Sequence, residues 1–481
     1  MDLLSDKNFL VLSLAAFVLI FLAFFPTTFA SIDEHTFLKN SILLKNGSIA
    51  ETNPELACRS HLYTENGYVG SQFIGRSVFL IPFTLFGLNG AMLSGLAIHI
   101  LNALLVYLIL KKLSIDARFT ILYIFFPVML WEARTLYSEL FVLTAFLAAF
   151  YFYINNKKES DVISGILLGL AVFVRYDAAA AFIAFALPLL IFDRKKLLGL
   201  LTGFVPLILL LFAFNNYAYS GPLNAGYGSG TSLLSSLFLI EPITVLAYLL
   251  VFLVLLPGML ISPIFSKNKQ YLFQFVLLAL AYLFLASRFT SFTAYEFSIE
   301  NLFTSRLRYV VPLIGIFLIS YSGMLDNFLS KIKIDRKMFF AGAFILLVVG
   351  GAYASYSHSK FLNSRAETRD QIQQNIPEGS LIIGSSDDCM FSLTPELERR
   401  SYLNIMQGLD IPREPEINFW QRLNGAYIIQ LSYSKKEGAR QQVIDAERKA
   451  MEEFVKQNSV QLQLIFETAS PNSLKIYKWI G

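Results

Sequence analysis

Two adjacent carboxylates, Asp33 and Glu34, follow the first long apolar segment of the chain, within FFPTTFASIDEHTFLKN at residues 24–40. A carboxylate can take a proton from an attacking hydroxyl and so act as a general base. Ionisable groups beside hydrocarbon are costly to bury and usually face a protein interior or a water-filled cavity. The pair therefore predicts a chemical site where an apolar helix meets water.

The distribution of Lys and Arg among the turns between apolar segments predicts a membrane topology. In that topology, further acids and arginines lie on the same outer side of the membrane as this pair. They are Glu132, Arg134, Glu139, Arg175, Asp177, Arg288, Glu296, Glu300, Arg306 and Arg308. Arginine can bind phosphate through two parallel hydrogen bonds and can stabilise charge on a leaving group. One interpretation is that helix ends simply carry solvated charges at the interface. The recurrence of these residues in all the larger outer turns instead favours a pocket for a sugar phosphate carried by a lipid.

The composition is that of a membrane protein with many passes. Of the 481 residues, 55% are hydrophobic and 15% are charged, whereas a soluble domain usually carries about 25% charged residues. No glycine-rich phosphate loop or nucleotide fingerprint occurs, and the basic turns are interpreted as topology determinants, so nucleic acid is not an expected partner. Two cysteines, Cys58 and Cys389, are too few for a disulfide framework, and a single bridge between them stays open.

The apolar runs predict about eleven membrane-spanning helices. They lie near residues 8–30, 89–110, 117–131, 137–154, 160–174, 177–192, 197–215, 238–263, 271–287, 308–325 and 338–355. Alternate turns (KKLSIDAR, NNKKESD, DRKK, SKNKQ and KIKIDRK) are rich in Lys and Arg, which assigns them to the cytoplasm. We therefore expect a multi-pass protein of the cell membrane with a cytoplasmic N-terminus. A signal-peptide cleavage site after TTFA is disfavoured by the mixed charge of residues 1–7.

The composition changes near residue 356. The stretches GSLIIGSSDD, AYIIQLSY, QLQLIFETA and SLKIYKWI are typical of strands, and the charged stretch at residues 439–457 is typical of a helix. We therefore predict a membrane domain at residues 1–355, with its first outer loop at residues 31–88. Residues 356–481 are predicted to form a small extracytoplasmic α/β domain, which either caps the membrane site or binds substrate.

Six motifs follow one another along nearly all of the membrane part. They are SIDEHTF, YVGSQFIGRSVFLIPFTLFG, LYSELFVLTAFLAAFYFY, FVRYDAAAAFIAF, NNYAYSGPLNAGYG and SRLRYVVPLIGIF. Their order, together with the predicted topology, resembles the GT-C superfamily of integral-membrane glycosyltransferases. The resemblance is greatest to the family 39-like branch related to dolichyl-phosphate-mannose–protein mannosyltransferases and aminoarabinose transferases.

The resemblance implies an all-α polytopic fold of GT-C type and an inverting transfer of a sugar from a polyprenyl- or dolichyl-phosphate donor. Asp33 falls on the position of the family's catalytic acid, and Glu34 falls on that of its usual partner. The acidic position that serves the acceptor or a metal in several members corresponds to Glu139 or Glu132. The basic pair expected to bind the donor phosphate corresponds to Arg306 and Arg308, with Arg175 as a further candidate.

No cofactor is certain, although Mg²⁺ or Mn²⁺ between Asp33 and Glu139 would suit oxygen ligands. The Trp-Trp-Asp signature of oligosaccharyltransferase catalytic subunits is absent, which argues against transfer of a whole glycan to asparagine. The sugar stays open, as does the acceptor, which is a protein, a lipid-linked glycan or a lipid. The alternative is a multi-pass transporter or lipid-linked sugar flippase, but such proteins usually carry ionisable groups at the membrane midplane.

Overall fold

The fold is given by a computed structural model of the chain. The residues that it describes are 5–53, 61–155, 157–224, 242–255, 258–259, 261–265, 274–283, 307–332, 334–384, 401–404, 423–432, 449–469 and 473–480.

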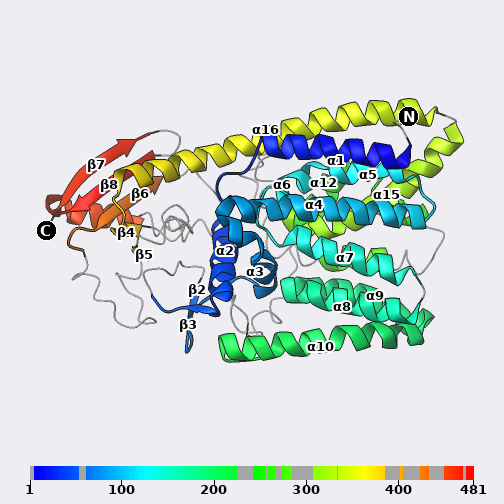
Figure 1. The fold of residues 1–481 in the computed structure, drawn as a ribbon, viewed down its shortest axis with the longest axis horizontal. Coiled ribbons are helices and arrows are strands. Elements are labelled where there is room, and N and C mark those ends of the chain that lie inside the picture. Colours follow the sequence, from blue (N-terminus) through cyan, green and yellow to red (C-terminus); the bar gives the residue numbers. More distant parts are fainter. Residues whose placement is uncertain are drawn as a thin grey trace.

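Apolar helices of different lengths lie side by side in one bundle (Figure 1). They are α1 (Asp6–Ala23), α4 (Gly87–Lys112), α7 (Glu139–Tyr153), α8 (Lys158–Val174), α9 (Ala179–Phe192), α10 (Arg194–Tyr219), α12 (Pro242–Leu255), α15 (Val311–Ile332) and α16 (Arg336–Asn375). One continuous cluster of buried apolar side chains forms the bundle core. Many Leu, Ile and Val side chains on the outside are exposed, as expected for helices that face lipid.

Among the described residues, five helices are long and apolar enough to cross a membrane. They cover Asp6–Ala23, Phe83–Lys112, Arg194–Tyr219, Leu307–Ile332 and Arg336–Asn375. Four shorter apolar helices accompany them, at Glu139–Tyr153, Tyr176–Phe192, Val245–Val254 and Gln274–Leu283. The prediction of a helical membrane protein is confirmed, whereas the count of about eleven spans is supported only in part.

The segment predicted as one span at residues 117–131 is not a single helix. It consists of η3 (Ala117–Phe119), α5 (Thr120–Ile124) and α6 (Pro127–Glu132). The break falls at Phe126, which has extended backbone angles because the proline ring that follows it disfavours the helical conformation. An average of hydropathy over the segment does not detect this break. Beyond the break, α6 ends inside the protein, and residues 133–138 form a buried loop.

Two helices and a small sheet form the segment between α1 and α4 that was predicted as the first outer loop. Helix α2 (Ile32–Lys45) runs across the ends of the bundle helices, with α3 (Ile74–Leu80) beside it (Figure 1). The strands β1 (Ala50–Glu51), β2 (His61–Thr64) and β3 (Gly67–Gly70) pair antiparallel in the order β1-β3-β2. A Cβ at Gly70 would collide with the Asn40 side chain, so the absence of a side chain lets β3 approach α2 closely.

The C-terminal part contains a five-stranded mixed sheet in the order β5-β4-β6-β8-β7. The strands are β4 (Leu381–Gly384), β5 (Ser401–Asn404), β6 (Tyr427–Ser432), β7 (Leu462–Thr468) and β8 (Ser473–Trp479). The four predicted strands are confirmed, together with helical structure at residues 449–457. Strand β5 was not predicted, because its four residues lie outside the strand-like apolar stretches of the sequence.

Helix α16 joins the bundle to this sheet. It runs for 40 residues without a break, so the domain boundary predicted after residue 355 falls inside a helix. Near its end, Ile372 packs with Ile376 and with apolar residues of β4, β6 and β8. The same cluster includes Ile32, the first residue of α2. The core of the C-terminal sheet therefore reaches the residue next to Asp33.

Candidate active site

Asp33 lies in the first turn of α2, and two side chains from distant segments hold its carboxylate. Gln72, between β3 and α3, donates a hydrogen bond from Nε2 to Oδ1 over 2.7 Å. Arg308 donates from Nη2 to Oδ2 over 3.1 Å. The Asp33 side chain is 20% exposed, so it is partly buried in a polar cluster but still accessible to a small group.

Arg308 lies in η7 (Leu307–Val310), and aromatic rings fix the plane of its guanidinium. The guanidinium carbon is 4.5 Å from the ring centre of Tyr137 and 4.7 Å from that of Tyr309. Such cation–π contacts stabilise a cation without using its N–H donors. Nη2 also donates to the Tyr309 hydroxyl over 2.7 Å. Nε is buried and has no hydrogen-bond partner, so this arginine is not saturated.

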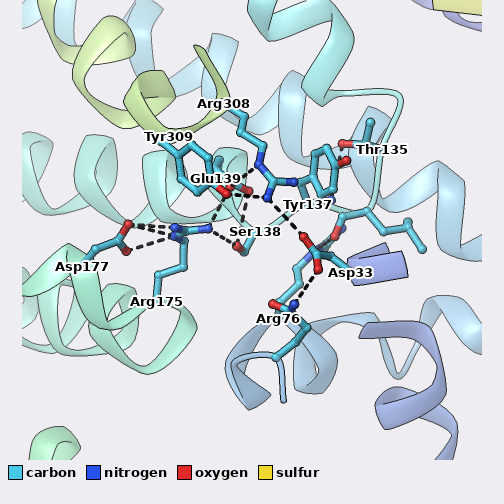
Figure 2. A network of polar contacts seen from close by, with 12 residues as sticks. Asp33, Arg76, Thr135, Tyr137, Ser138, Glu139, Arg175, Asp177, Arg308 and Tyr309 are labelled. Carbon is cyan, nitrogen blue, oxygen red and sulfur yellow. Dashed lines mark hydrogen bonds and ion pairs between the residues drawn. The ribbon is translucent and has the colours of Figure 1, made fainter. Parts of the chain in front are cut away.

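The second arginine of the cluster is Arg175, which binds both Glu139 and Asp177. Arg175 Nη1 lies 2.8 Å from Glu139 Oε1 and also donates to Ser138. Its Nε and Nη2 both donate to Asp177, with distances of 2.8–3.2 Å. Glu139 lies between Arg175 and Arg308, and Asp33 lies on the other side of Arg308 (Figure 2). Two guanidinium groups and three carboxylates thus form one connected network.

Glu34 has a different environment from its neighbour Asp33. Its side chain is fully buried, with Oε1 accepting from the amides of Ala30 and Ser31 and Oε2 accepting from the amide of Leu136. Burial raises the pKa of Glu34 to about 7, although these three amide donors favour the charged form. With both oxygens bound by backbone, Glu34 ties the start of α2 to the loop that carries Tyr137.

Arg76 also binds this loop. It lies on α3, is almost fully buried, and donates to the Leu136 carbonyl over 3.1 Å and to Ser94 Oγ over 2.9 Å. Burial lowers the pKa of Arg76 to about 10, so the side chain remains charged at neutral pH. Glu34 and Arg76 together fix both backbone groups of Leu136.

Glu132 is buried near the cluster. It is the last residue of α6 and is 3% exposed, and its Oε2 atom has no hydrogen-bond partner. It makes none of the ion pairs in the described network, whereas Glu139 makes two. Of the two candidates for the second acidic position, the structure therefore brings Glu139 into the network with Asp33.

Three residues of this cluster were not predicted from the sequence, namely Gln72, Tyr137 and Tyr309. All three lie within the quoted motifs, so the signal was present but their partners were not predictable. The predicted residues Arg306, Arg288, Glu296 and Glu300 lie outside the described residues, as do Cys58 and Cys389.

A divalent metal does not fit the arrangement of Asp33 and Glu139. The Arg308 guanidinium lies between them, 3.1 Å from Asp33 and 3.9 Å from Glu139. Wherever side chains are described, no group of three or more His, Cys, Asp and Glu residues could hold a metal ion. The charge of both carboxylates is already balanced by arginine.

The fold and the cluster define a polytopic membrane protein with an acid–arginine network where the α2 segment crosses the bundle. Its fold is that of ArnT from Cupriavidus metallidurans, an aminoarabinose transferase. In the apo state, that structure matches with a TM-score of 0.56 and 11% identity over 98% of both chains. The structure of ArnT bound to undecaprenyl phosphate matches with a TM-score of 0.53 and 10% identity, also over 98% of both chains.

The archaeal oligosaccharyltransferase AglB from Archaeoglobus fulgidus, in complex with an inhibitory peptide and a dolichol-phosphate, matches with a TM-score of 0.44 and 12% identity. That match covers 79% of this chain and 62% of AglB. No protein-family model matches the chain, and no curated protein matches it by sequence. The polytopic fold expected from the sequence resemblance is supported by the two ArnT structures, with which this chain shares its fold.

Proposed function

We propose that this protein is a glycosyltransferase that takes a sugar from a polyprenyl-phosphate donor and transfers it to an extracytoplasmic acceptor. The observation that carries the proposal is the pairing of Asp33 with Arg308, which lie 275 residues apart in the chain. The fold supports it, since ArnT shares that fold and one of its structures holds undecaprenyl phosphate.

In the proposed reaction, Asp33 accepts the proton of an acceptor hydroxyl as that oxygen attacks the anomeric carbon of the donor sugar. The bond from the anomeric carbon to the phosphate oxygen breaks, and its electron pair leaves with the phosphate. Arg308 stabilises the charge on this leaving group. Attack from the face opposite the phosphate inverts the anomeric configuration.

The remaining predicted residues receive supporting roles in this proposal. Glu139 positions the acceptor, and Arg175 keeps Glu139 in place because its own donors are occupied by carboxylates and Ser138. Glu34 is a positioning residue that sets the start of α2, since backbone amides occupy both of its oxygens. Arg306 stays a prediction as a second phosphate ligand. No step requires a metal.

The test uses the full chain reconstituted in lipid vesicles with a panel of polyprenyl-phosphate sugars carrying a radioactive sugar. We expect the wild-type protein to transfer label from at least one donor to an added peptide, glycan or lipid acceptor. Asp33→Asn should reduce the transfer rate roughly 100- to 10,000-fold, the range expected for loss of a general base.

Glu159→Asn is the matched control, because this acid is exposed at the start of α8 and should leave the rate unchanged. Full transfer by Asp33→Asn would exclude the general-base role. Movement of the labelled donor across the vesicle membrane, without transfer to any acceptor, would favour the flippase alternative instead.

A further inference from the structure

The two arginines of the network differ in how many of their donors are free. All three nitrogens of the Arg175 guanidinium group donate to Asp177, Glu139 or Ser138. Arg308 instead makes two hydrogen bonds in the described network, both from Nη2, one to Asp33 and one to the Tyr309 hydroxyl. Its buried Nε makes no hydrogen bond and lies 3.9 Å from Glu139 Oε1. Of these two side chains, Arg308 therefore has the larger unused donor capacity for a new anion.

A phosphate that binds Arg308 competes directly with Asp33. Guanidinium binds phosphate best through two parallel N–H groups, and Nη2 is the nitrogen that Asp33 already occupies. Two anions at one nitrogen repel each other strongly in a partly buried site, since the Arg308 and Asp33 side chains are only 14% and 20% exposed. The phosphate and the Asp33 carboxylate therefore exclude each other at this position.

Each partner of the pair is held independently of the other. The rings of Tyr137 and Tyr309 keep the Arg308 guanidinium in its plane whatever anion it binds. Gln72, which is 5% exposed, binds the other oxygen of Asp33 over 2.7 Å with a neutral amide. A neutral donor on Oδ1 does not compete with phosphate for charge, so Asp33 keeps its place when Arg308 is taken.

We propose that donor binding exchanges the partner of Arg308 from Asp33 to phosphate, while Gln72 acts as the positioning residue that retains Asp33. This inference rests on the proposed function and adds an order of events to it. Before the donor binds, Oδ2 of Asp33 already accepts a bond from Arg308, which competes with an acceptor hydroxyl for this oxygen. After the donor phosphate binds Arg308, Oδ2 is released and can accept the proton. The donor therefore binds before the acceptor is activated.

The test measures binding of farnesyl phosphate, a soluble polyprenyl phosphate without a sugar, to the purified full chain in detergent. We expect Asp33→Asn to bind it about tenfold more tightly than the wild type, because a competing anion has been removed from Arg308. Arg308→Gln should bind it at least about tenfold more weakly. Asp33→Ala serves as a second variant in case Asn forms a new bond to Arg308.

Glu65→Gln is the matched control for charge. Glu65 is exposed in the turn between β2 and β3, outside the network, so the loss of its negative charge should change the affinity less than about twofold. Equal tightening by Glu65→Gln and Asp33→Asn would mean that only the overall charge matters, which overturns the exchange. Weaker or unchanged binding by both Asp33 variants would also overturn it.

The role of Gln72 is tested by Gln72→Leu in the same binding assay and in sugar transfer. We expect farnesyl phosphate affinity within about twofold of the wild type and a kcat lowered roughly 10- to 100-fold, since a bond to a charged group is lost without contact to phosphate. Unchanged kcat would overturn this part. If the wild-type chain bound no farnesyl phosphate, the proposed function itself would fail, whereas binding without tightening by the Asp33 variants would refute the exchange alone.

Discussion

Neighbouring residues of the same chemical type have different surroundings in this cluster. Asp33 bonds to two side chains and remains partly exposed, while Glu34 is buried against three backbone amides. Successive helix positions point about 100° apart, so at the start of α2 one acid faces the network and the next faces the loop before α7. Adjacent position in a motif therefore does not imply a shared function.

Glu34 predicts a pH dependence of stability. Its pKa in the folded protein, about 7, lies above the ordinary value of 4.5, so the folded state binds this proton more tightly than the unfolded chain. The stability from this proton is fully present below pH 4.5 and is lost as the pH rises through about 7. We expect the melting temperature in detergent to fall between about pH 5 and pH 8.

Glu34→Gln should remove that part of the pH dependence. It should also lower stability by about 1–3 kcal/mol, because the amide NH₂ group then faces a backbone N–H donor. Glu159→Gln, at an exposed acid, should retain the wild-type slope of melting temperature against pH. The same slope in Glu34→Gln and in the wild type would show that another group titrates instead.

At the scale of elements, α16 holds both segments that carry the site. Trp131 donates to the Ala354 carbonyl over 3.2 Å, and its ring stacks on His358 with centroids 4.4 Å apart. Arg134 donates to the carbonyls of Phe24 and Ser355. The segment before α2 and the loop before α7 are thus fixed to one helix, which sets the distance between Asp33 and Glu139.

Arg134→Met tests this role of α16. The change keeps much of the side-chain volume but leaves the carbonyls of Phe24 and Ser355 without this donor, so we expect a loss of about 2–4 kcal/mol in stability, more than for an uncharged hydrogen bond. Sugar transfer should also fall, since the two halves of the network are no longer held together. Lys360→Met, at an exposed position of α16, is the control. Equal melting temperatures for the two variants would contradict the prediction.

For the whole molecule, the C-terminal sheet is structurally continuous with the site. Helix α16 starts at the end of the bundle where Arg336 binds Asp116, and it ends at the sheet beyond the opposite end (Figure 1). There Ile32 joins the apolar cluster formed by Ile372, Ile376 and three strands. A change in the packing of the sheet is therefore transmitted to the residue before Asp33.

Ile32→Ala tests this connection. A cavity at this site, where Ile32 is 7% exposed, should cost about 2–4 kcal/mol of stability, against about 0.5–1.5 kcal/mol for Ile32→Val. Transfer activity should fall in the same order, because the first turn of α2 loses its fixed position. Differential scanning fluorimetry and the transfer assay measure the two effects. A destabilised Ile32→Ala protein with undiminished transfer, assayed well below its melting temperature, would refute the connection.

The sequence by itself determined the class of the protein, because hydropathy and strand-length apolar stretches depend on residues close together in the chain. Bundle helices and four strands of the C-terminal sheet could be predicted in this way, as could the collection of acids and arginines that contains the site. The helix break before Pro127 could also have been predicted from the proline, but a hydropathy window averages over it. Only the tertiary structure decided that Asp33 pairs with Gln72 and Arg308 and that Arg175 is already occupied by Glu139 and Asp177. Those pairings join residues 36 to 275 positions apart, apart from the local bond to Asp177, and they depend on how the helices pack.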